Sequence, residues 1–329
     1  MKQIVLFFLV LILFACNSND GNQNSKHHDQ NEKVINFQLN WFNDPTFTGE
    51  YIAFEKYWKL QKLNIQLNEG GVGIDPISMV STKKADYAVV GADKALIAIS
   101  NGAPITIVSV DLQRNPVGWI ARPELKISKI GDCIDRKDIE LGDKAGTEVS
   151  AILKLMFKRK EIDIETAAVS FDFSYFISNK NSVYPVYLNE EPVKARILHK
   201  INVIEIDPAK EENGKIELYG NVIITHNDKL INSPKEVKAI INGIIDGWGD
   251  AIKNKQKAVE IVMKYVKGEE EYILGVIDRT LEFVTNLYGK TVPPGHMEKT
   301  SWENTVLTLK DAGLLKNSID INKSVKFVN

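Results

Sequence analysis

Short strand-like and helix-like segments alternate along most of this chain, and this alternation limits the folds that it can adopt. Residues 35–39 and 63–67 place apolar side chains in the two-residue period of a strand, whereas residues 49–58 place them at helical spacing. The succession continues with a helix at 76–81, a strand at 87–90, a helix at 93–100 and a strand at 105–110. Repeated βα units predict a mainly parallel α/β sheet.

A second set of strands and helices follows the first. Strands are expected at 118–122, 138–141, 167–171, 182–186 and 202–206, helices at 145–158 and 192–200, and a returning strand at 221–225. Beyond residue 234 the pattern is nearly all helical, with helices expected at 237–254, 257–266, 270–288 and 302–312. A chain of 329 residues has room for about two domains, which agrees with two α/β sets.

Glycine-containing turns stand where the predicted strands end. Gly70, Gly71 and Gly73 follow the second strand, and Gly91-Ala92-Asp93 follows the third. In open α/β sheets, ligands bind at the carboxyl ends of the strands. Gly146 and Thr147 open a predicted helix, whose first free amides would face a ligand. We therefore expect the binding site at these turns.

Composition and motifs exclude several classes of protein. The chain has 41 Lys+Arg against 43 Asp+Glu, which argues against a nucleic-acid binder. Its 44% hydrophobic and 26% charged residues fit neither a disordered tail nor a multi-pass membrane protein. The sequence lacks a nucleotide-binding loop, a zinc-type HExxH and a Gly-x-Ser-x-Gly elbow, and His199, His226 and His296 are scattered. We expect no enzymatic activity, no cofactor and no metal site.

The N-terminus has the pattern of an export signal. Residues 4–14 form an unbroken apolar run, which is too short to span a bilayer as a helix. The run ends in Leu13-Phe14-Ala15-Cys16, which resembles a bacterial lipoprotein signal. This predicts a signal peptide at 1–15, a lipidated Cys16 and a polar tether through residue 32; the alternative is a conventional signal peptide that ends near a cysteine. We therefore expect a lipoprotein of the cell envelope that faces the periplasm or the exterior. A lipidated Cys16 leaves no second cysteine for a disulfide.

Several short fragments, taken in their order along the chain, then point to a family. They are Asn40-Trp41-Phe42, residues 49–56, Gly70-Gly71-Val72-Gly73, Lys84-Ala85-Asp86-Tyr87, residues 115–119, Gly146-Thr147-Glu148, Glu191-Pro192-Val193, Tyr219-Gly220-Asn221-Val222 and Gly247-Trp248. In order and spacing they resemble the sulfonate, nitrate and thiamin-pyrimidine-precursor binding proteins of ABC importers, which are related to the yeast-type pyrimidine synthase.

The resemblance implies a periplasmic-binding-protein type II fold, in which two α/β lobes close on a ligand around a hinge of two crossing strands. It implies lobe one at 33–118 plus 223–329 and lobe two at 119–222. The family usually has Gly after the lysine of the first helix, whereas here Tyr57 directly follows Lys56. Glu50 also stands at a position that is aromatic in many members. A cysteine-rich motif like that of the synthase is missing, which argues against synthase activity.

The candidate ligand-binding residues combine aromatic rings with hydrogen-bond acceptors. The rings could sandwich a flat ligand, and they are Trp41, Tyr51, Trp119, Phe171 and Tyr187. The carboxylates could accept hydrogen bonds from ring amino groups, and they are Glu50, Asp93, Asp172 and Glu191. Asn40, Thr147, Gly71 and Gly146 complete the expected site. The alternatives are ordinary ones: Trp41 and Tyr51 as core residues, and Glu50 and Glu191 as acids in the first turns of helices.

These residues suit a nitrogen heterocycle better than an oxyanion, which needs donors and usually a cation. We expect a lipid-anchored substrate-binding protein that is a monomer and delivers a thiamin pyrimidine precursor to an ABC permease and its ATPase. Riboflavin is the second candidate ligand, and an alkylsulfonate such as taurine is the third. A sensor, an adhesin and a synthase-like or lyase-type enzyme are the competing classes.

Overall fold

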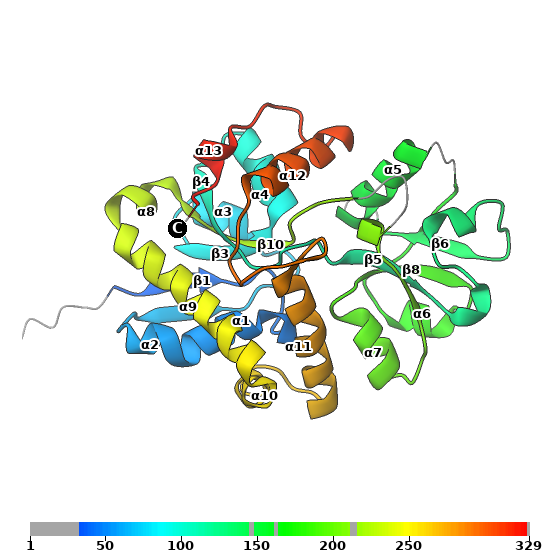
Figure 1. Cartoon of the computed structure of the whole chain (residues 1–329), viewed down its shortest axis with the longest axis horizontal. Helices are drawn as coiled ribbons and strands as arrows, with labels where there is room; N and C mark the ends of the chain where they lie inside the picture. The colour runs from blue at the N-terminus through cyan, green and yellow to red at the C-terminus, as the bar shows by residue number, and fades with distance from the viewer. Residues whose placement is uncertain (1–32, 145–147, 161–163, 211–215, 328–329) are drawn as a thin grey trace, which may run out of the picture. The chain divides into compact units, whose positions relative to one another are not determined.

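Two five-stranded sheets, each with its own helices, make up the computed structural model, which describes residues 33–144, 148–160, 164–210 and 216–327 (Figure 1). Lobe one is defined here by the sheet with strand order β2-β1-β3-β10-β4. Its strands are β1 (Ile35–Gln38), β2 (Ile65–Asn68), β3 (Tyr87–Gly91), β4 (Ile105–Val110) and β10 (Asn221–His226). The lobe therefore combines an N-terminal segment with a strand that returns more than one hundred residues later.

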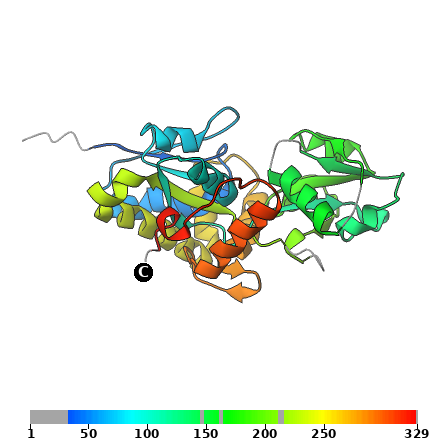
Figure 2. The ribbon, with the colours of Figure 1, turned by 90° about the horizontal axis from the view of Figure 1, so that it is seen from above.

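Lobe two is defined by the sheet with strand order β7-β6-β8-β5-β9. Its strands are β5 (Val117–Ala121), β6 (Glu140–Asp143), β7 (Ala167–Ala168), β8 (Ser182–Tyr187) and β9 (Ile204–Ile206). In Figure 2 this lobe is green, and the blue, yellow and red segments all belong to lobe one. The division at 118/119 and 222/223 stays a prediction.

Both sheets are mixed, whereas the βα pattern predicted mainly parallel ones. Strands β1, β2 and β3 pair in parallel, and so do β6, β7 and β8. The returning strand β10 is antiparallel to both β3 and β4, and β5 is antiparallel to both β8 and β9. These two antiparallel strands are the ones in which the chain arrives from the other lobe. A βα period carries no signal for that reversal, because each strand alone looks the same in both directions.

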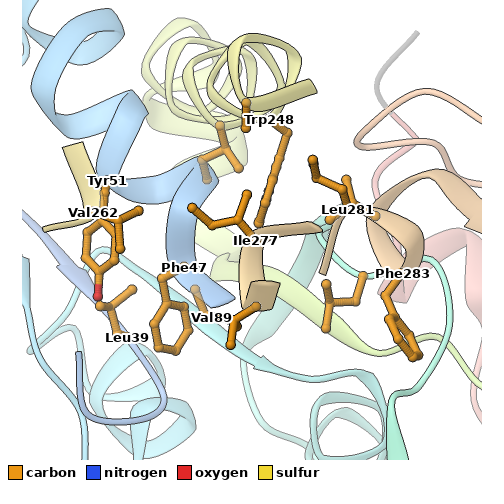
Figure 3. Packing of buried hydrophobic residues seen from close by; sticks show 14 of the residues in the cluster. Leu39, Phe47, Tyr51, Val89, Trp248, Val262, Ile277, Leu281 and Phe283 are labelled. Carbon is orange, nitrogen blue, oxygen red and sulfur yellow. The ribbon is translucent and has the colours of Figure 1, made fainter. Parts of the chain in front are cut away.

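Neighbouring residues of the central strands face different cores. Val89 packs with the helices α1, α9, α10 and α11, whereas Ala88 and Val90 pack with α3, α4 and α12. Figure 3 shows Phe47, Trp248 and Ile277 meeting over the first of these faces. Lobe two repeats the alternation, since Trp119 belongs to the core with α5 and its neighbour Ile120 to the core with α6 and α7. Helices therefore cover both faces of each sheet, and the strand ends remain as the place for a site.

The helices of lobe one are η1 (Pro45–Phe47), α1 (Thr48–Ile52), the π-helical turn η2 (Ala53–Tyr57), α2 (Trp58–Leu60), α3 (Pro76–Ser81), α4 (Ala92–Ser100), α8 (Asn227–Asn232), α9 (Pro234–Lys253), α10 (Lys255–Val262), α11 (Glu270–Thr285), α12 (Lys299–Asp311) and α13 (Ile321–Ser324). Those that follow strands of lobe two are η3 (Pro123–Leu125), η4 (Ile130–Cys133), α5 (Glu148–Lys160), α6 (Ser174–Ser178), α7 (Glu191–Ile197) and η5 (Pro208–Lys210). Among the described residues, none of these helices combines the length and apolar character that a bilayer crossing requires.

Two segments differ from their predictions for identifiable reasons. The helix expected over 270–288 ends at Thr285, because the chain turns there into a hairpin of β11 (Asn286–Leu287) and β12 (Lys290–Thr291). Tyr288 and Gly289 adopt φ of +48° and +95° at its tip, which a helix does not allow. The strand expected over 167–171 shrinks to Ala167–Ala168 at the edge of its sheet, and this frees Phe171 and Asp172 for the following loop.

Candidate functional site

The loops that follow the parallel strands of both lobes carry most of the predicted site residues. Asn40 and Trp41 follow β1, Gly71 follows β2, and Phe171 and Asp172 follow β7. The segments that follow β3, β6 and β8 lie closer to the middle of their sheets. Asn40 also reaches the returning strand, because its side-chain amide lies 3.5 Å from the Asn221 Oδ1 atom. Strand ends from two separate sheets therefore supply one set of loops.

Trp41 and Phe171 meet across the two lobes. Their ring centroids are 6.4 Å apart, and the two rings are tilted by 41°. Trp41 is 41% exposed and Phe171 is 58% exposed, which is unusual for rings of this size. Aromatic surface that stays open on both sides of a lobe boundary is suited to holding a flat ring. The alternative interpretation of Trp41 as a core residue is wrong in this structure.

Glycines allow the two loops of lobe one to touch. Gly70 donates its N–H to the Trp41 carbonyl at 2.8 Å, and a Cβ atom on Gly70 would strike the backbone at Leu39 and Trp41. Gly71 has φ of +145°, and its missing side chain leaves room for the Phe42 ring. Gly71 therefore acts on the shape of the loop, which explains the glycines without a phosphate-binding role.

Tyr51 is buried and holds the loop after β1 in place. Its ring stacks on Tyr265 at a centroid distance of 4.4 Å, so this ring face is occupied by the protein. Its hydroxyl donates to Asn43 Oδ1 at 3.0 Å and accepts from the Asp44 N–H at 3.1 Å. Tyr51 thus positions the loop after β1, and the structure does not give it the expected place beside a ligand.

Glu50 is also fully buried, in a carboxyl pair with Asp111. Neither Glu50 side-chain oxygen has a hydrogen bond of good geometry among the described residues, whereas Asp111 Oδ1 accepts a bond of 2.5 Å from the Trp248 indole. Burial, and then repulsion by Asp111, raises the pKa of Glu50 well above its usual range. Burial likewise raises the pKa of Asp111 to about 7. Glu50 of α1 is thus buried beside Asp111, whose carboxyl group binds Trp248 of α9.

Asp93 lies in the first turn of α4, directly beyond β3. It is only 4% exposed, and its Oδ1 atom has no hydrogen-bond partner in the described part of the chain. An acceptor that is buried without a donor is costly, and a ligand donor would relieve that cost. The predicted role of Asp93 as a hydrogen-bond acceptor is therefore compatible with its position.

Lobe two separates its predicted residues into two groups. Trp119 is fully buried on β5, where its indole donates to the Gly142 carbonyl at 3.3 Å, so it belongs to the core. Asp172 is exposed, and its side chain accepts from the N–H of Ser174, the first residue of α6, at 2.9 Å. Tyr187 and Glu191 are half-buried and adjacent, because the Tyr187 N–H donates to Glu191 Oε2 at 2.8 Å. Burial raises the pKa of Glu191, and Lys144 partly opposes that rise.

Lys144 is the cation that the sequence analysis missed. It directly follows β6, and its ammonium lies 5.0 Å from the Phe171 ring centroid and 4.9 Å from that of Tyr184. Burial lowers its pKa, and Glu191 and Glu190 oppose this effect. A lysine after a short strand has no motif of its own, so the sequence carried no local signal for it.

Two arginines of the chain that could supply positive charge to an anion site, Arg114 and Arg122, have structural partners. Arg114 forms a buried ion pair with Asp207 at 2.9 Å, and its guanidinium lies over the Phe283 ring. Arg122 donates to the Ile177 carbonyl at 3.0 Å and closes the end of α6. Lys144, and neither arginine, therefore contributes positive charge beside the exposed Phe171 ring.

Asp44 and Glu190 were also missed, and both lie at the contact between the lobes. Asp44 belongs to the loop after β1, and Glu190 immediately precedes α7. Burial raises the pKa of each carboxyl group, and the two groups affect each other's ionisation. Sequence reasoning passed over Glu190 because the neighbouring Glu191-Pro192 carried the family resemblance.

Three predicted residues lie outside the described part of the chain. They are Cys16, Gly146 and Thr147. Within the described part, no group of three or more His, Cys, Asp or Glu side chains could hold a metal ion.

Comparison with known proteins gives relatives at low identity. The riboflavin-binding protein RibY of Chloroflexus aurantiacus is 20% identical over 251 residues, which are 74% of this chain and 70% of that protein. The aliphatic sulphonate binding protein SsuA of Escherichia coli superposes with a TM-score of 0.66 at 11% identity, covering 90% of this chain and 92% of that one. SsuA of Xanthomonas axonopodis, solved with bound MOPS, has a TM-score of 0.63 at 10% identity, covering 89% and 98%.

These solved structures establish the periplasmic-binding-protein fold that the fragments implied. The sequence also matches the family model described as NMT1/THI5 like over residues 44–258. That segment contains the Phe171 loop, Glu190 and every strand of lobe two, whereas Trp41 lies before its first residue. The chain belongs to the NMT1/THI5-like family.

Proposed function

We propose that this protein is the substrate-binding component of an ABC importer and captures a flat nitrogen heterocycle between its two lobes. The observation that carries this proposal is the pair of exposed rings, Trp41 and Phe171, which approach each other from different lobes. The relatives named as riboflavin-binding and sulphonate-binding proteins support a transport role. A ligand that contacts both lobes favours the closed arrangement, which a permease could then recognise.

The charges around the rings favour a ligand with ring amino groups over a simple anion. Asp93 follows β3, and Glu190 and Glu191 follow β8, so their carboxyl groups lie at other strand ends of the same two sheets, where they could accept hydrogen bonds. Lys144 adds one cation, but Glu190 and Glu191 are the charges that act on it. An aminopyrimidine precursor of thiamin is therefore the first candidate, riboflavin the second and an alkylsulfonate such as taurine the third.

The remaining parts of the proposal concern the cellular setting. The apolar run and Cys16 favour a lipid-anchored protein outside the cytoplasmic membrane, tethered near its permease and ATPase. We expect the protein to be a monomer. We also expect it to release its ligand unchanged, because the motifs of common catalytic sites are missing from the sequence. Incubation of the identified ligand with the protein should therefore give no new product by mass spectrometry.

Native mass spectrometry of the purified protein tests the ligand class directly. The panel holds an aminopyrimidine thiamin precursor, thiamin, riboflavin and taurine, and the readout is a retained or added mass. An aminopyrimidine adduct that Trp41→Ala weakens supports the proposal. A riboflavin adduct would still support a binding protein that uses the exposed rings, but it would make riboflavin the first candidate ligand. A taurine adduct overturns the heterocycle, and binding of no panel member removes the support for this ligand class.

A further inference from the structure

Helix α11 belongs to lobe one but presents one of its faces to lobe two. The members of this face recur every three or four residues, which places them on one side of the helix. They are Tyr272, Gly275, Arg279 and Phe283, and we call this face the α11 seam. A different side of α11 faces its own lobe, where Asp278 pairs with Lys255 of α10 at 2.6 Å. The helix is therefore shared between the two lobes.

Helix α11 binds each of three consecutive residues in the loop that follows β8. The bonds run from Arg279 Nε to the Leu188 carbonyl at 3.1 Å, from Asn189 Nδ2 to Thr280 Oγ1 at 3.4 Å, and from the Tyr272 hydroxyl to Glu190 Oε1 at 3.2 Å. This loop leads directly into Glu191, a candidate acceptor for the ligand. A helix of lobe one thus holds a loop of lobe two that borders the candidate site.

Arg279 also binds a strand of lobe two. Its Nη2 atom lies 2.5 Å from the Oε2 atom of Glu205 on β9, and its side chain is only 17% exposed. An ion pair that is shielded from water in this way is screened by salt less than an exposed one. One cation of lobe one therefore connects the loop after β8 with β9.

The apolar part of the α11 seam is closely packed. A Cβ atom on Gly275 would lie 2.8 Å from Val193 Cγ1 and 2.9 Å from Ile197 Cδ1, both of α7. The helices approach this closely because position 275 has no side chain. Val193 is buried in the same apolar cluster as Ile277 of α11. The hydrophobic core therefore continues from one lobe into the other through α11 and α7.

The C-terminal end of the α11 seam lies at the segment that joins β4 to β5. The Gln113 N–H donates to the Phe283 carbonyl at 2.7 Å, and the Arg114 guanidinium lies 3.9 Å from the Phe283 ring centroid. From Phe283 to Tyr272 the helix rises about 16 Å. Contacts near Phe283 can persist while the lobes rotate about the crossing segments. Contacts near Tyr272 must break when the lobes separate, because displacement grows with distance from a hinge.

We propose that the α11 seam holds the two lobes together before any ligand binds, and thereby sets the balance between open and closed molecules. The protein alone makes the seam, so its stabilisation is present in the unliganded state. A ligand then adds to closure and does not supply all of it. Weakening the seam should lower the closed fraction and, with it, the apparent affinity for a ligand. The inference goes beyond the proposed function, because it depends on no ligand.

The reaction of a thiol placed inside the seam tests the inference on the unliganded full chain. Asn189→Cys puts this thiol at a position that is 3% exposed and faces α11. The introduced thiol can react with iodoacetamide when the seam parts, whereas native Cys133, buried in the core of lobe two, reports unfolding of that lobe. Peptide mass mapping gives both rates in one sample. We expect the introduced thiol to react faster than Cys133.

Two further variants, each made in the Asn189→Cys protein, should weaken the seam through different contacts. Gly275→Ala places a methyl group against α7, although alanine is the better helix former. Arg279→Met removes the polar bonds, and Glu205 stays paired with Arg196 of α7 at 3.0 Å. Each variant should speed the reaction of the introduced thiol by at least about fivefold, the equivalent of about 1 kcal/mol, and leave the rate at Cys133 unchanged.

The matched controls alter α11 or its start without reaching lobe two. Gly268→Ala adds a Cβ whose nearest neighbour is 3.8 Å away, and Lys255→Met removes an ion pair within lobe one. Both should leave the two rates unchanged. If Gly275→Ala or Arg279→Met does not fold, Tyr272→Phe removes a single hydroxyl and should raise the rate at the introduced thiol by about twofold or more.

Three results would overturn the inference. They are equal rates at the two thiols, seam variants that react no faster than the controls, and a parallel rise at Cys133, which would mean that lobe two unfolds. The measurement needs no ligand. Failure to find a ligand would therefore count against the proposed function and leave this result unaffected.

Discussion

At the scale of single residues, exposure separates the side chains that are available to a ligand from those that build the lobes. Trp41 and Phe171 keep open surface, whereas Tyr51 and Trp119 are fully buried. The four were predicted on the same grounds, because each is an aromatic near a strand end. Sequence alone could not separate them, since burial depends on what packs above the ring and that comes from distant segments.

Replacing an exposed ring should weaken ligand binding with little change in stability. We expect Trp41→Ala and Phe171→Ala each to lower affinity by roughly twofold to thirteenfold, the equivalent of one aromatic contact of about 0.5–1.5 kcal/mol. Isothermal titration with the ligand found by mass spectrometry measures this. Leu60→Ala, at a residue that is 71% exposed, is the control and should change neither affinity nor melting temperature. Full affinity in both ring variants would exclude them from the site.

Glu191 and Lys144 carry opposite charges, so two variants can show whether the bound ligand is basic or anionic. Glu191→Gln keeps an oxygen for the Tyr187 N–H, so it should lower affinity for an amino heterocycle more than it lowers stability. Lys144→Met should weaken an anionic ligand and leave a basic one bound. Affinities and melting temperatures of both variants, measured on one ligand, give the comparison. Loss of affinity only in Lys144→Met would reject the amino heterocycle.

At the scale of elements, the close approach of α1 and α9 depends on two glycines. A Cβ atom on Gly49 would strike the Trp248 indole, and one on Gly247 would strike the Gly49 carbonyl. This contact also encloses Glu50 and Asp111, whose carboxyl groups lie beside that indole. The helices were predicted from periodicity, but their separation is set by residues that have no side chain. A periodic pattern does not report how closely two helices pack.

Alanine at these glycines should destabilise the fold. We expect Gly247→Ala to lower the free energy of unfolding by about 1–3 kcal/mol, because the methyl group overfills the contact. Gly249→Ala is the matched control in the same helix, where the added Cβ meets nothing within 4 Å. It should raise the free energy by about 0.5–1 kcal/mol through helix propensity. Urea unfolding measures both, and equal effects of the two variants would contradict the packing argument.

The buried acids between the same helices should make stability depend on pH. The pKa of Glu50 and that of Asp111 are both raised in the folded protein, the latter to about 7. Their protonated forms are therefore favoured by folding, and the stabilisation present at acidic pH is lost as pH rises through the folded pKa. We expect the unfolding free energy to fall by about 1 kcal/mol per pH unit between the unfolded carboxyl value of about 4 and the folded value of about 7, and to level off at higher pH. Glu50→Gln should make the decline shallower, and an unchanged slope would assign the effect to other groups.

At the scale of the whole molecule, the sequence predicted the two-lobed fold more fully than the site. Nearly every strand and long helix was recognisable, because apolar periodicity records which face each element buries. The contacts that matter for the site join residues far apart in the chain, such as Trp41 with Phe171 and Tyr272 with Glu190. Neither partner of such a pair carries a local signal for the other. The family resemblance located the loops but not the residues that meet between them.

The position of β10 within its sheet has a consequence for the order in which this chain can fold. β10 lies between β3 and β4, yet in the chain it comes after all five strands of lobe two. Lobe two is continuous from β5 to β9 and can assemble as soon as it emerges. The first hundred residues must wait with an incomplete sheet until residue 226 is available. The sheet of lobe one therefore begins with the first strands of the chain but is completed only after the strands of lobe two are available.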